Sequence, residues 1–340
     1  MKITEAALRN PAAVAVTAIG ALTGDFIFVG DVGRPDLREN VGHMRAKRED
    51  LAKEMYNTIS QKYTSLPDDA LVYPAHGAGS LCGKGMSADA TSSTLGNERL
   101  GNWAFKKQTE EQFVANLLDS QPFIPHYFGY NVDTNKEGAE ILWKAVGNVE
   151  FKLAITEAEE NILTVDVRNE KNFKENHLPG SINIMVGGEN SKFETWLGSI
   201  VKPSEKYQII VDAVKDVPNI INRIAKIGYE KQLHCVATLA QQKMKTSEEM
   251  PLEDFRKNPS NYTILDIRND GEIQEGKIFE DAITIPLHKL RENISEIPTN
   301  KPIVVHCAAG YRSAAGSSIL ESEINQTSVY DLGESIKEYR

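Results

Sequence analysis

The residues best suited to chemistry lie in the segment HCAAGYRS, at 306–313. Cys307 follows an apolar run, Gly310 permits a tight turn, and Arg312 supplies a guanidinium. The backbone N–H groups of a loop that turns into a helix point at one spot, and the helix dipole adds partial positive charge there. Because this setting stabilises a thiolate, we expect Cys307 to be a nucleophile, with Arg312 folded over the mouth to hold an anionic sulfur-oxygen group.

This loop must be positioned by a strand before it and a helix after it. The segment PIVVHCA, at 302–308, is rich in β-branched residues, which is typical of a buried parallel strand. The small residues of 313–320, followed by Ile319 and Leu320, predict a helix that packs closely on the sheet. Open α/β sheets present their chemistry at the carboxyl ends of the strands, and the sequence places Cys307 at such an end.

An internal repeat indicates that the chain contains this type of domain twice. The segments ILTVDVRNEKNF (162–173) and TILDIRNDGEI (263–273) share a strand followed by Asp-x-Arg-Asn, and Asp166 and Asp266 lie 100 residues apart. Each copy continues with two further short apolar strands and a helix. Strands that alternate with helices predict two small α/β domains with parallel sheets.

The first copy lacks the residues for the same chemistry. Its third strand ends near Asp212, and the VKDVPN that follows at 214–219 contains neither cysteine nor arginine. The nearest thiol, Cys235, lies in the strand-like segment LHCVATL, where we expect a buried structural cysteine. Because no thiol stands at this place, this copy is predicted to be non-catalytic.

The cysteine loop, together with LDIRN at 265–269, resembles the active loop of the rhodanese family. The resemblance implies that Cys307 attacks a sulfane sulfur, holds it as a persulfide and yields it to an acceptor thiol or anion. It also implies that Asp266 and Arg268 brace the domain. The persulfide would be cradled by the N–H groups of the loop: Ala308, Ala309, Gly310, Tyr311 and Arg312.

Two other interpretations of Cys307 compete with sulfur transfer. A cysteine phosphatase has five residues between its cysteine and its arginine, whereas Cys307 and Arg312 enclose four, a smaller ring that suits a single sulfur atom. An inert buried cysteine is common at a strand end. Gly310, Tyr311 and Arg312 are poor core material, however, so we expect an accessible thiol.

Two N-terminal motifs, TGDFIFVGDVGRPDL (23–37) and YPAHGAGSLCGK (73–84), resemble the later half of persulfide dioxygenases. These are iron enzymes of the metallo-β-lactamase fold, and some carry two rhodanese domains, one without its cysteine. The resemblance places Asp25 on the carboxylate iron ligand and His76 on a histidine near the metal. The histidine motifs that precede Thr-Gly-Asp in the family are absent. We therefore expect a truncated segment with a vestigial site that binds no iron and has no dioxygenase activity.

The rest of this segment predicts short strands and amphipathic helices. Apolar runs at 26–30 and 70–74 are strand-like, and Thr109 with Gln112 forms a capping box for a following helix. One face of another helix is marked by apolar residues at helical spacing: Leu51, Met55, Ile59 and Tyr63.

Composition limits the partners. A net charge of −10 and a pI near 5.3 disfavour nucleic acid and membrane surfaces, so small sulfur donors and thiol acceptors are the expected partners. Three scattered cysteines suggest neither a disulfide framework nor a cysteine zinc site and favour a reducing cytoplasm. Half of a metallo-β-lactamase fold would expose an apolar sheet face, so self-association through the N-terminal segment is possible.

The sequence as a whole predicts an α/β protein in three parts. We expect a truncated metallo-β-lactamase-like segment at 1–134, an inactive rhodanese-like domain at 135–247 and an active rhodanese domain at 248–340, with a polar linker near 133–138. The predicted activity is transfer of sulfane sulfur from persulfide, polysulfide or thiosulfate. The alternative is a sulfur-binding scaffold of the persulfide dioxygenase family whose iron site is lost or completed elsewhere.

Overall fold

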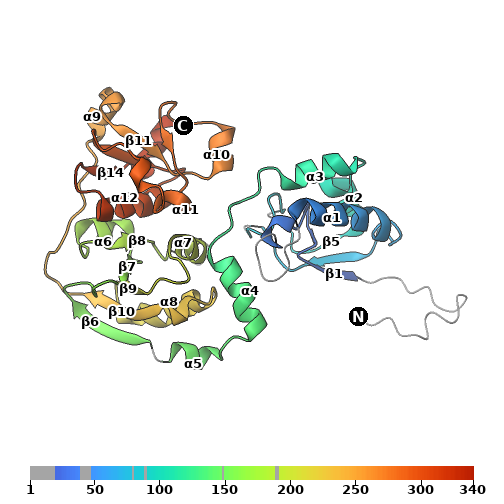
Figure 1. Ribbon diagram of the computed structural model, residues 1–340, viewed down its shortest axis with the longest axis horizontal. Helices are drawn as coiled ribbons and strands as arrows, with labels where there is room; N and C mark the ends of the chain where they lie inside the picture. Colours follow the sequence, from blue (N-terminus) through green and yellow to red (C-terminus); the bar gives the residue numbers. More distant parts are fainter. Residues whose placement is uncertain (1–19, 39–46, 79, 88–89, 148, 188–190) are drawn as a thin grey trace, which may run out of the picture. The chain divides into compact units, whose positions relative to one another are not determined.

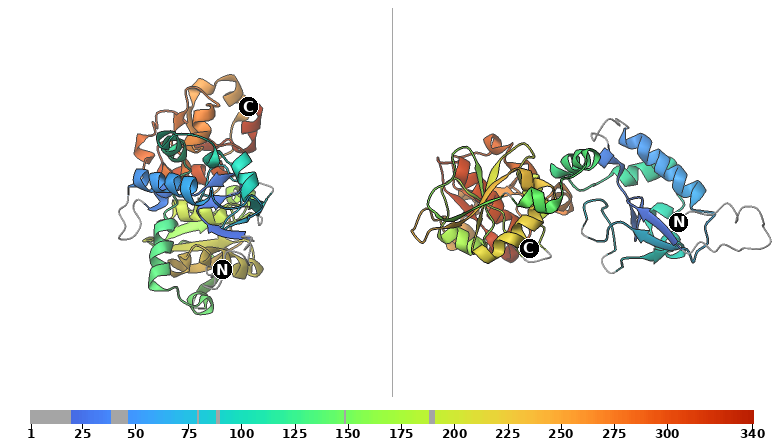
Figure 2. Two further views of the ribbon diagram at one scale, coloured as in Figure 1. Left: turned by 90° about the vertical axis from the view of Figure 1, so that its right-hand side faces the viewer. Right: turned by 90° about the horizontal axis from the view of Figure 1, so that it is seen from below.

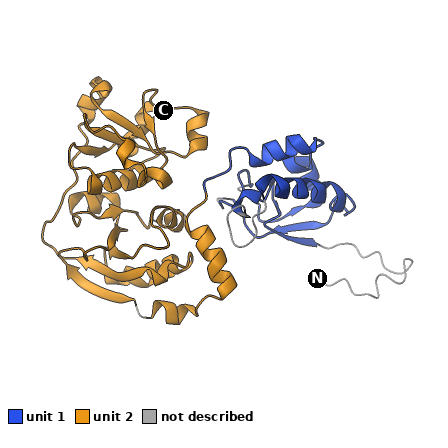
Figure 3. Cartoon of the chain, viewed as in Figure 1, with its two compact units in different colours: residues 1–123 blue, residues 124–340 orange. Residues whose placement is uncertain are grey.

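The computed structural model describes residues 20–38, 47–78, 80–87, 90–147, 149–187 and 191–340. They belong to two compact units, Met1–Phe123 and Ile124–Arg340 (Figure 3). Within these ranges, none of the helices combines the length and the apolar character that crossing a membrane requires.

Unit 1 has a small mixed sheet with helices (Figure 1). The sheet order is β1 (Gly20–Gly24), β4 (Leu71–Pro74) and β5 (Ser93–Thr94). Strand β1 is parallel to β4, and β5 is antiparallel to it. A second, antiparallel pair is formed by β2 (Ile27–Phe28) and β3 (Asp31–Val32). The α-helices are α1 (Arg48–Lys62), α2 (Leu95–Gly101) and α3 (Glu110–Leu118).

Helices α1 and α3 pack together, α1 through the apolar face that the sequence pattern predicts. Met55 and Ile59 of α1 are buried in one apolar cluster with Phe113 of α3. The predicted capping box of Thr109 and Gln112 is present at the start of α3. It satisfies N–H groups that the first helical turn leaves without partners, and it fixes where the helix begins.

A close backbone approach joins Asp25 and Phe26, before β2, to Gly33, after β3. The Gly33 N–H donates to the Phe26 carbonyl, and a Cβ at Gly33 would lie 1.7 Å from the carbonyl oxygen of Asp25. No side chain fits there without a shift of the backbone, so this turn requires glycine at position 33.

Gly33→Ala should therefore destabilise unit 1 by about 1–3 kcal/mol or more, as overpacking against rigid backbone does. Hydrogen–deuterium exchange should become faster in residues 20–38 and stay unchanged in 191–340. Gly101→Ala is the matched control, because a Cβ at Gly101 meets nothing within 4 Å. Equal effects of the two substitutions would contradict this assignment.

Unit 2 contains two parallel sheets, seen in Figures 1 and 2. The first has the order β6 (Glu150–Ile155), β10 (Leu233–Leu239), β9 (Tyr207–Val211), β7 (Leu163–Asp166) and β8 (Ile182–Asn183). The second has the order β12 (Ile283–Thr284), β11 (Thr263–Asp266), β13 (Ile303–His306) and β14 (Val329–Asp331). All neighbouring strands in both sheets are parallel, as the repeat predicts.

The α-helices of unit 2 include one where a linker was expected. The polar stretch 133–138 is helical up to Glu137, and the predicted boundary at 134/135 falls inside α4. Aromatic residues earlier in this helix anchor it, since the rings of Tyr130 and Tyr229 pack edge to face, and Gly138 ends it with a φ of +94°. The helices are α4 (Tyr127–Glu137), α5 (Leu142–Val146), α6 (Glu170–Glu175), α7 (Phe193–Ile200), α8 (Val217–Ala225), α9 (Leu252–Lys257), α10 (Asp270–Glu275), α11 (Leu287–Leu290) and α12 (Tyr311–Glu323).

Helix α12 joins the two repeats. It contacts β13 and β14 of its own repeat and β8 of the first repeat, so it lies between the two sheets (Figure 1). Its residues 313–320, mostly small, are all buried, which allows close approach on both sides. The backbone N–H of Asn183 donates to the Ser318 hydroxyl across the contact, at 2.8 Å. The repeats therefore share one packed interior.

Candidate active site

Cys307 lies at the carboxyl end of a central parallel strand, as predicted. Strand β13 ends at His306 and α12 begins at Tyr311, so residues 307–310 form the connecting loop. Gly310 turns the chain with a φ of +105°, and its N–H donates to the Cys307 sulfur at 3.2 Å. A Cβ at Gly310 would lie 3.1 Å from the backbone of Gly333 and Glu334, so the loop is closely backed by the next segment.

The Cys307 side chain is more enclosed than the sequence suggested. We expected an accessible thiol, but Cys307 is only 1% exposed. Ala309 is exposed and Ala308 half-buried, so the loop itself faces solvent while its cysteine points inward. The thiol itself is therefore shielded from solvent.

Arg312 has a partner that sequence reasoning missed. Its Nη2 donates to Glu272 Oε1 at 2.7 Å, and its Nη1 donates to the other carboxylate oxygen. Burial opposes ionisation of Glu272, but the bond from Arg312 still holds the pKa of Glu272 below its ordinary value. The Arg312 guanidinium also lies 6.0 Å from the ring centroid of Trp196 in the first repeat. Arg312 is thus held at the loop by a carboxylate.

Glu272 combines this pairing with a local role. It is the third residue of α10, and its carboxylate also accepts the N–H of Asn269 in a capping box. The sequence NDGE, at 269–272, could have revealed this box. The contact with Arg312, 40 residues later, has no local signal.

Asp266 and Arg268 form a buried ion pair that braces the end of β11. Both Asp266 carboxylate oxygens accept from the Arg268 guanidinium, at 2.6–3.0 Å, and Nη2 of Arg268 also donates to the Gly276 carbonyl at 3.0 Å. Asp166 and Arg168 repeat this arrangement in the first copy, with the Asn176 carbonyl as the second acceptor. The pair ties a strand end to the end of the following helix.

Arg268→Leu should lower the free energy of unfolding by about 3–5 kcal/mol, because it leaves the Asp266 carboxylate buried without its partner. Arg256→Leu is the matched control. Arg256 pairs with Glu338 through three hydrogen bonds at the surface, where such a pair contributes about 1 kcal/mol or less. Urea unfolding of both variants tests this, and similar losses would contradict a structural role for the Asp266–Arg268 pair.

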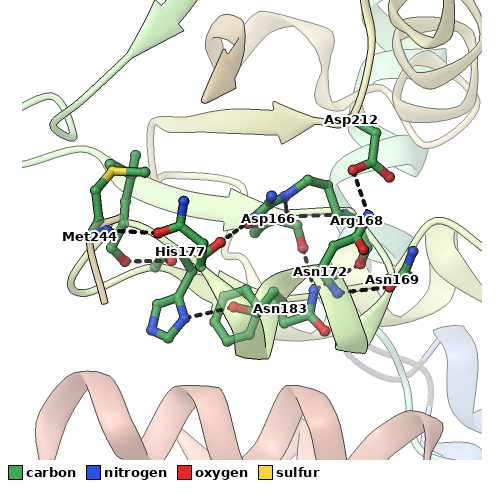
Figure 4. A network of polar contacts seen from close by, with 12 residues as sticks. Asp166, Arg168, Asn169, Asn172, His177, Asn183, Asp212 and Met244 are labelled. Carbon is green, nitrogen blue, oxygen red and sulfur yellow. Dashed lines mark hydrogen bonds and ion pairs between the residues drawn. The ribbon is translucent and has the colours of Figure 1, made fainter. Parts of the chain in front are cut away.

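The first repeat has a different constellation at the same place (Figure 4). Asp212 follows β9 where Cys307 follows β13, and its carboxylate accepts from the Asn172 side chain at 2.8 Å. Asn172 is the counterpart of Glu272 on the helix after Asp-x-Arg-Asn. Cys235 is buried in β10, as expected, with its sulfur 3.6 Å from Gln208 Oε1, and burial raises its pKa.

His177 of the first repeat has a structural environment. Its Nδ1 lies 2.9 Å from the Phe173 carbonyl oxygen, and its ring stacks on the Phe173 ring at a centroid distance of 4.1 Å. Burial lowers the pKa of His177 to about 4. The residue is therefore neutral at physiological pH and fills the turn before β8.

In unit 1, Asp25 and His76 lie together, near where the resemblance places a metal. Asp25 Oδ1 is 3.2 Å from His76 Nε2, and the sulfur of Cys82 completes a group whose donor atoms all lie within 4.8 Å of one another. The resemblance implies iron held by two histidines and a carboxylate. Over the described residues, this group offers one histidine and a thiol instead, so the donor set does not match that iron site.

The rhodanese-like domain family matches residues 150–236 and 252–340, which together make up more than half of the chain. The chain belongs to the rhodanese family. A protein of Bacillus subtilis (strain 168), the uncharacterized YqhL, is 31% identical to this rhodanese-family chain over 120 residues, which are 35% of this chain and 83% of YqhL. A sulfurtransferase of Allochromatium vinosum is 40% identical over 50 residues, which are 15% of this chain and 46% of that protein. Sulfur transfer is the general chemistry that these comparisons support.

The crystal structure of a metallo-β-lactamase from Staphylococcus aureus subsp. aureus COL is also similar to this rhodanese-family chain. It has a TM-score of 0.55 and 32% sequence identity, and the match covers 65% of this chain. The chain spans 60% of the length of that structure. The predicted fold, a metallo-β-lactamase-like segment followed by two rhodanese-like domains, is confirmed.

Proposed function

We propose that this protein is a sulfurtransferase that carries sulfane sulfur as a persulfide on Cys307. The observation that supports it most directly is the hydrogen bond from the Gly310 N–H to the Cys307 sulfur at the start of α12. Backbone N–H groups and the helix dipole at this position stabilise negative charge on sulfur, first on the thiolate and then on the outer sulfur of the persulfide.

The transfer takes place in two steps that balance without an external oxidant or reductant. The Cys307 thiolate attacks the outer sulfur of a donor R–S–SH, the donor S–S bond breaks, and R–S⁻ leaves as the Cys307–S–SH bond forms. An acceptor thiolate then attacks the same outer sulfur, forms a new persulfide and releases the Cys307 thiolate. Each step breaks one S–S bond and forms another.

Persulfides and organic polysulfides are the donors that the charge balance of the loop favours over thiosulfate. Thiosulfate is a dianion, and it needs an available cation to offset the loss of its hydration. Arg312 is the cation nearest to the loop in sequence, but the Glu272 carboxylate already accepts two hydrogen bonds from it. A neutral or singly charged donor loses less hydration on binding, so it needs less of the positive charge of Arg312.

The first repeat would cover one side of the Cys307 site and would not be a second active site. Tyr311, the first residue of α12, donates its hydroxyl proton to the Met185 carbonyl of the first repeat at 2.6 Å, and Trp196 lies beside Arg312. Both contacts hold the end of the loop at which α12 begins. We propose small sulfur donors and thiol acceptors as the partners, and no iron-dependent step.

Mass spectrometry of the full chain after treatment with glutathione persulfide tests the proposal. We expect one added sulfur atom on Cys307 and its loss when an acceptor thiol is supplied, with repeated turnover. A stoichiometric sulfur adduct without turnover would instead indicate the scaffold alternative. Hydrolysis of an aryl phosphate by Cys307 would indicate the phosphatase alternative, and persulfide-dependent oxygen uptake with one iron per chain would overturn the absence of dioxygenase activity.

A further inference from the structure

Strand β6 lies at one edge of the sheet of the first repeat (Figure 1). Among the described residues, β6 pairs with β10 alone. An edge strand presents a row of backbone N–H and C=O groups that can pair with another strand, and proline is one device that prevents such pairing. Strand β6 has six residues and no proline. Its outer edge is therefore suited to receive a further strand.

The apolar side chains of β6 are exposed to solvent. Phe151 is 36% exposed and Leu153 is 70% exposed. Three more exposed apolar residues come shortly before the strand, at the start of α5: Ile141, Leu142 and Trp143. Large apolar side chains beside an open strand edge favour association with another chain. A strand that paired with β6 would shield Phe151 and Leu153 from water.

The charged side chains of β6 lie on the other face of the strand. Glu150 and Lys152 alternate with Phe151 and Leu153, so the two charges share one face and the two apolar residues share the opposite face. The Lys152 Nζ lies 3.9 Å from Glu150 Oε2, and it also pairs with Glu159. The strand thus carries one negative and one positive residue, two positions apart.

We propose that β6 is an interface at which two copies of this chain pair antiparallel, with a two-fold axis at Phe151. Such an axis is perpendicular to the sheet and keeps every residue on its own face, so even-numbered residues meet even-numbered residues of the second copy. An axis at Phe151 places Glu150 of each copy opposite Lys152 of the other. Opposite charges directly across a strand pair are stabilising. The strand is therefore complementary to itself in this register.

The neighbouring registers are less favourable. An axis at Glu150 places two glutamates opposite each other, and an axis at Lys152 places two lysines opposite each other. Like charges directly across a strand pair are destabilising. An axis at Leu153 requires regular pairing of Ala154, whose φ of +55° interrupts the strand. The charges and the backbone together select the axis at Phe151.

The size of this contact predicts a weak dimer. In the proposed register, Phe151 of one copy lies opposite Phe151 of the other, on the apolar face of the joined sheets. A stable interface buries about 800 Å² on each partner. Two paired strands of this length cover less than that, so we expect association in the micromolar range that depends on concentration.

Sedimentation velocity of the full chain at micromolar concentrations tests the proposal. We expect a monomer–dimer equilibrium. Glu150→Lys and Lys152→Glu each place like charges opposite each other at two positions, and each should weaken association by at least about tenfold. The double variant should restore the dimer. An equimolar mixture of the two single variants should also associate, because each reversed charge then faces its opposite.

Glu280→Lys is the matched control, because it makes the same change of charge at an exposed position of the second repeat. It should associate as the unmodified protein does. An unmodified chain that stays monomeric overturns the proposal, as does a dimer that Glu150→Lys does not weaken. Folded single variants that fail to associate when mixed reject the axis at Phe151. Thermal unfolding checks each variant. If Lys152→Glu is unfolded, because it places a second carboxylate beside Glu159, Glu150→Lys decides alone.

Discussion

Replacing Cys307 with serine should abolish sulfur transfer to cyanide and to small thiols while leaving the fold intact. A serine hydroxyl is not ionised near neutral pH, so it cannot attack a sulfane sulfur, and loss of a catalytic nucleophile costs on the order of a thousandfold or more. The Gly310 N–H can still donate to the serine oxygen, so the loop keeps its hydrogen bond. Steady-state rates with glutathione persulfide as donor measure the effect.

The matched control for this prediction is Cys235→Ala. Cys235 is buried in β10, and burial raises its pKa, so it stays protonated and out of reach of donors. We expect the turnover of the Cys235→Ala variant to equal that of the unmodified protein. If the added sulfur is found on Cys235, or if Cys307→Ser keeps its rate, the active and silent assignments of the two repeats must be exchanged.

Glu272→Gln should raise kcat/KM for thiosulfate by about tenfold relative to a neutral organic polysulfide. Removing the carboxylate charge frees the Arg312 guanidinium for an anionic donor, and a charge-assisted hydrogen bond contributes about 1.5–3 kcal/mol, where 1.4 kcal/mol corresponds to tenfold. Arg312→Ala should act in the opposite direction and weaken thiosulfate more than the polysulfide. Competition between the two donors measures both changes.

Glutamine is a suitable substitute because it keeps the other role of position 272. Its side-chain oxygen can still accept the Asn269 N–H, so the capping box of α10 remains. The double variant Arg312→Ala with Glu272→Gln should lose the gain for thiosulfate. Equal changes for the two donors in either single variant would mean that Arg312 has no role in donor choice.

The position of Cys307 could be predicted from the sequence, but its burial could not. A β-branched strand and a helix of small residues are local patterns, and together they place the cysteine at the carboxyl end of β13. The backing of the loop comes from Gly333 and Glu334, which follow β14. Nothing in the segment 302–320 indicates that they will lie there, and so we wrongly expected an accessible thiol.

The metal-binding candidates show the same division between local and distant signals. Asp25 and His76 stand in motifs, and their meeting follows from the parallel pairing of β1 and β4. Cys82 joins them through a loop that Arg34 and Asp31 anchor from outside it, so cysteine spacing gave no sign of a site. The helix in the stretch 133–138, where we expected a polar linker, has a related cause, because Tyr130 packs on the distant Tyr229 and stabilises it.

The burial of α12 between two sheets has a consequence for how this protein can change over generations. A repeat that has lost its nucleophile is free to vary at Asp212, where no sulfur is bound in our proposal. It is not free to vary where Asn183 and Met185 receive α12, because those positions complete the interior of its neighbour. The first copy is therefore expected to persist in descendants together with its neighbour, since deleting it would expose to water the side of α12 that contacts β8.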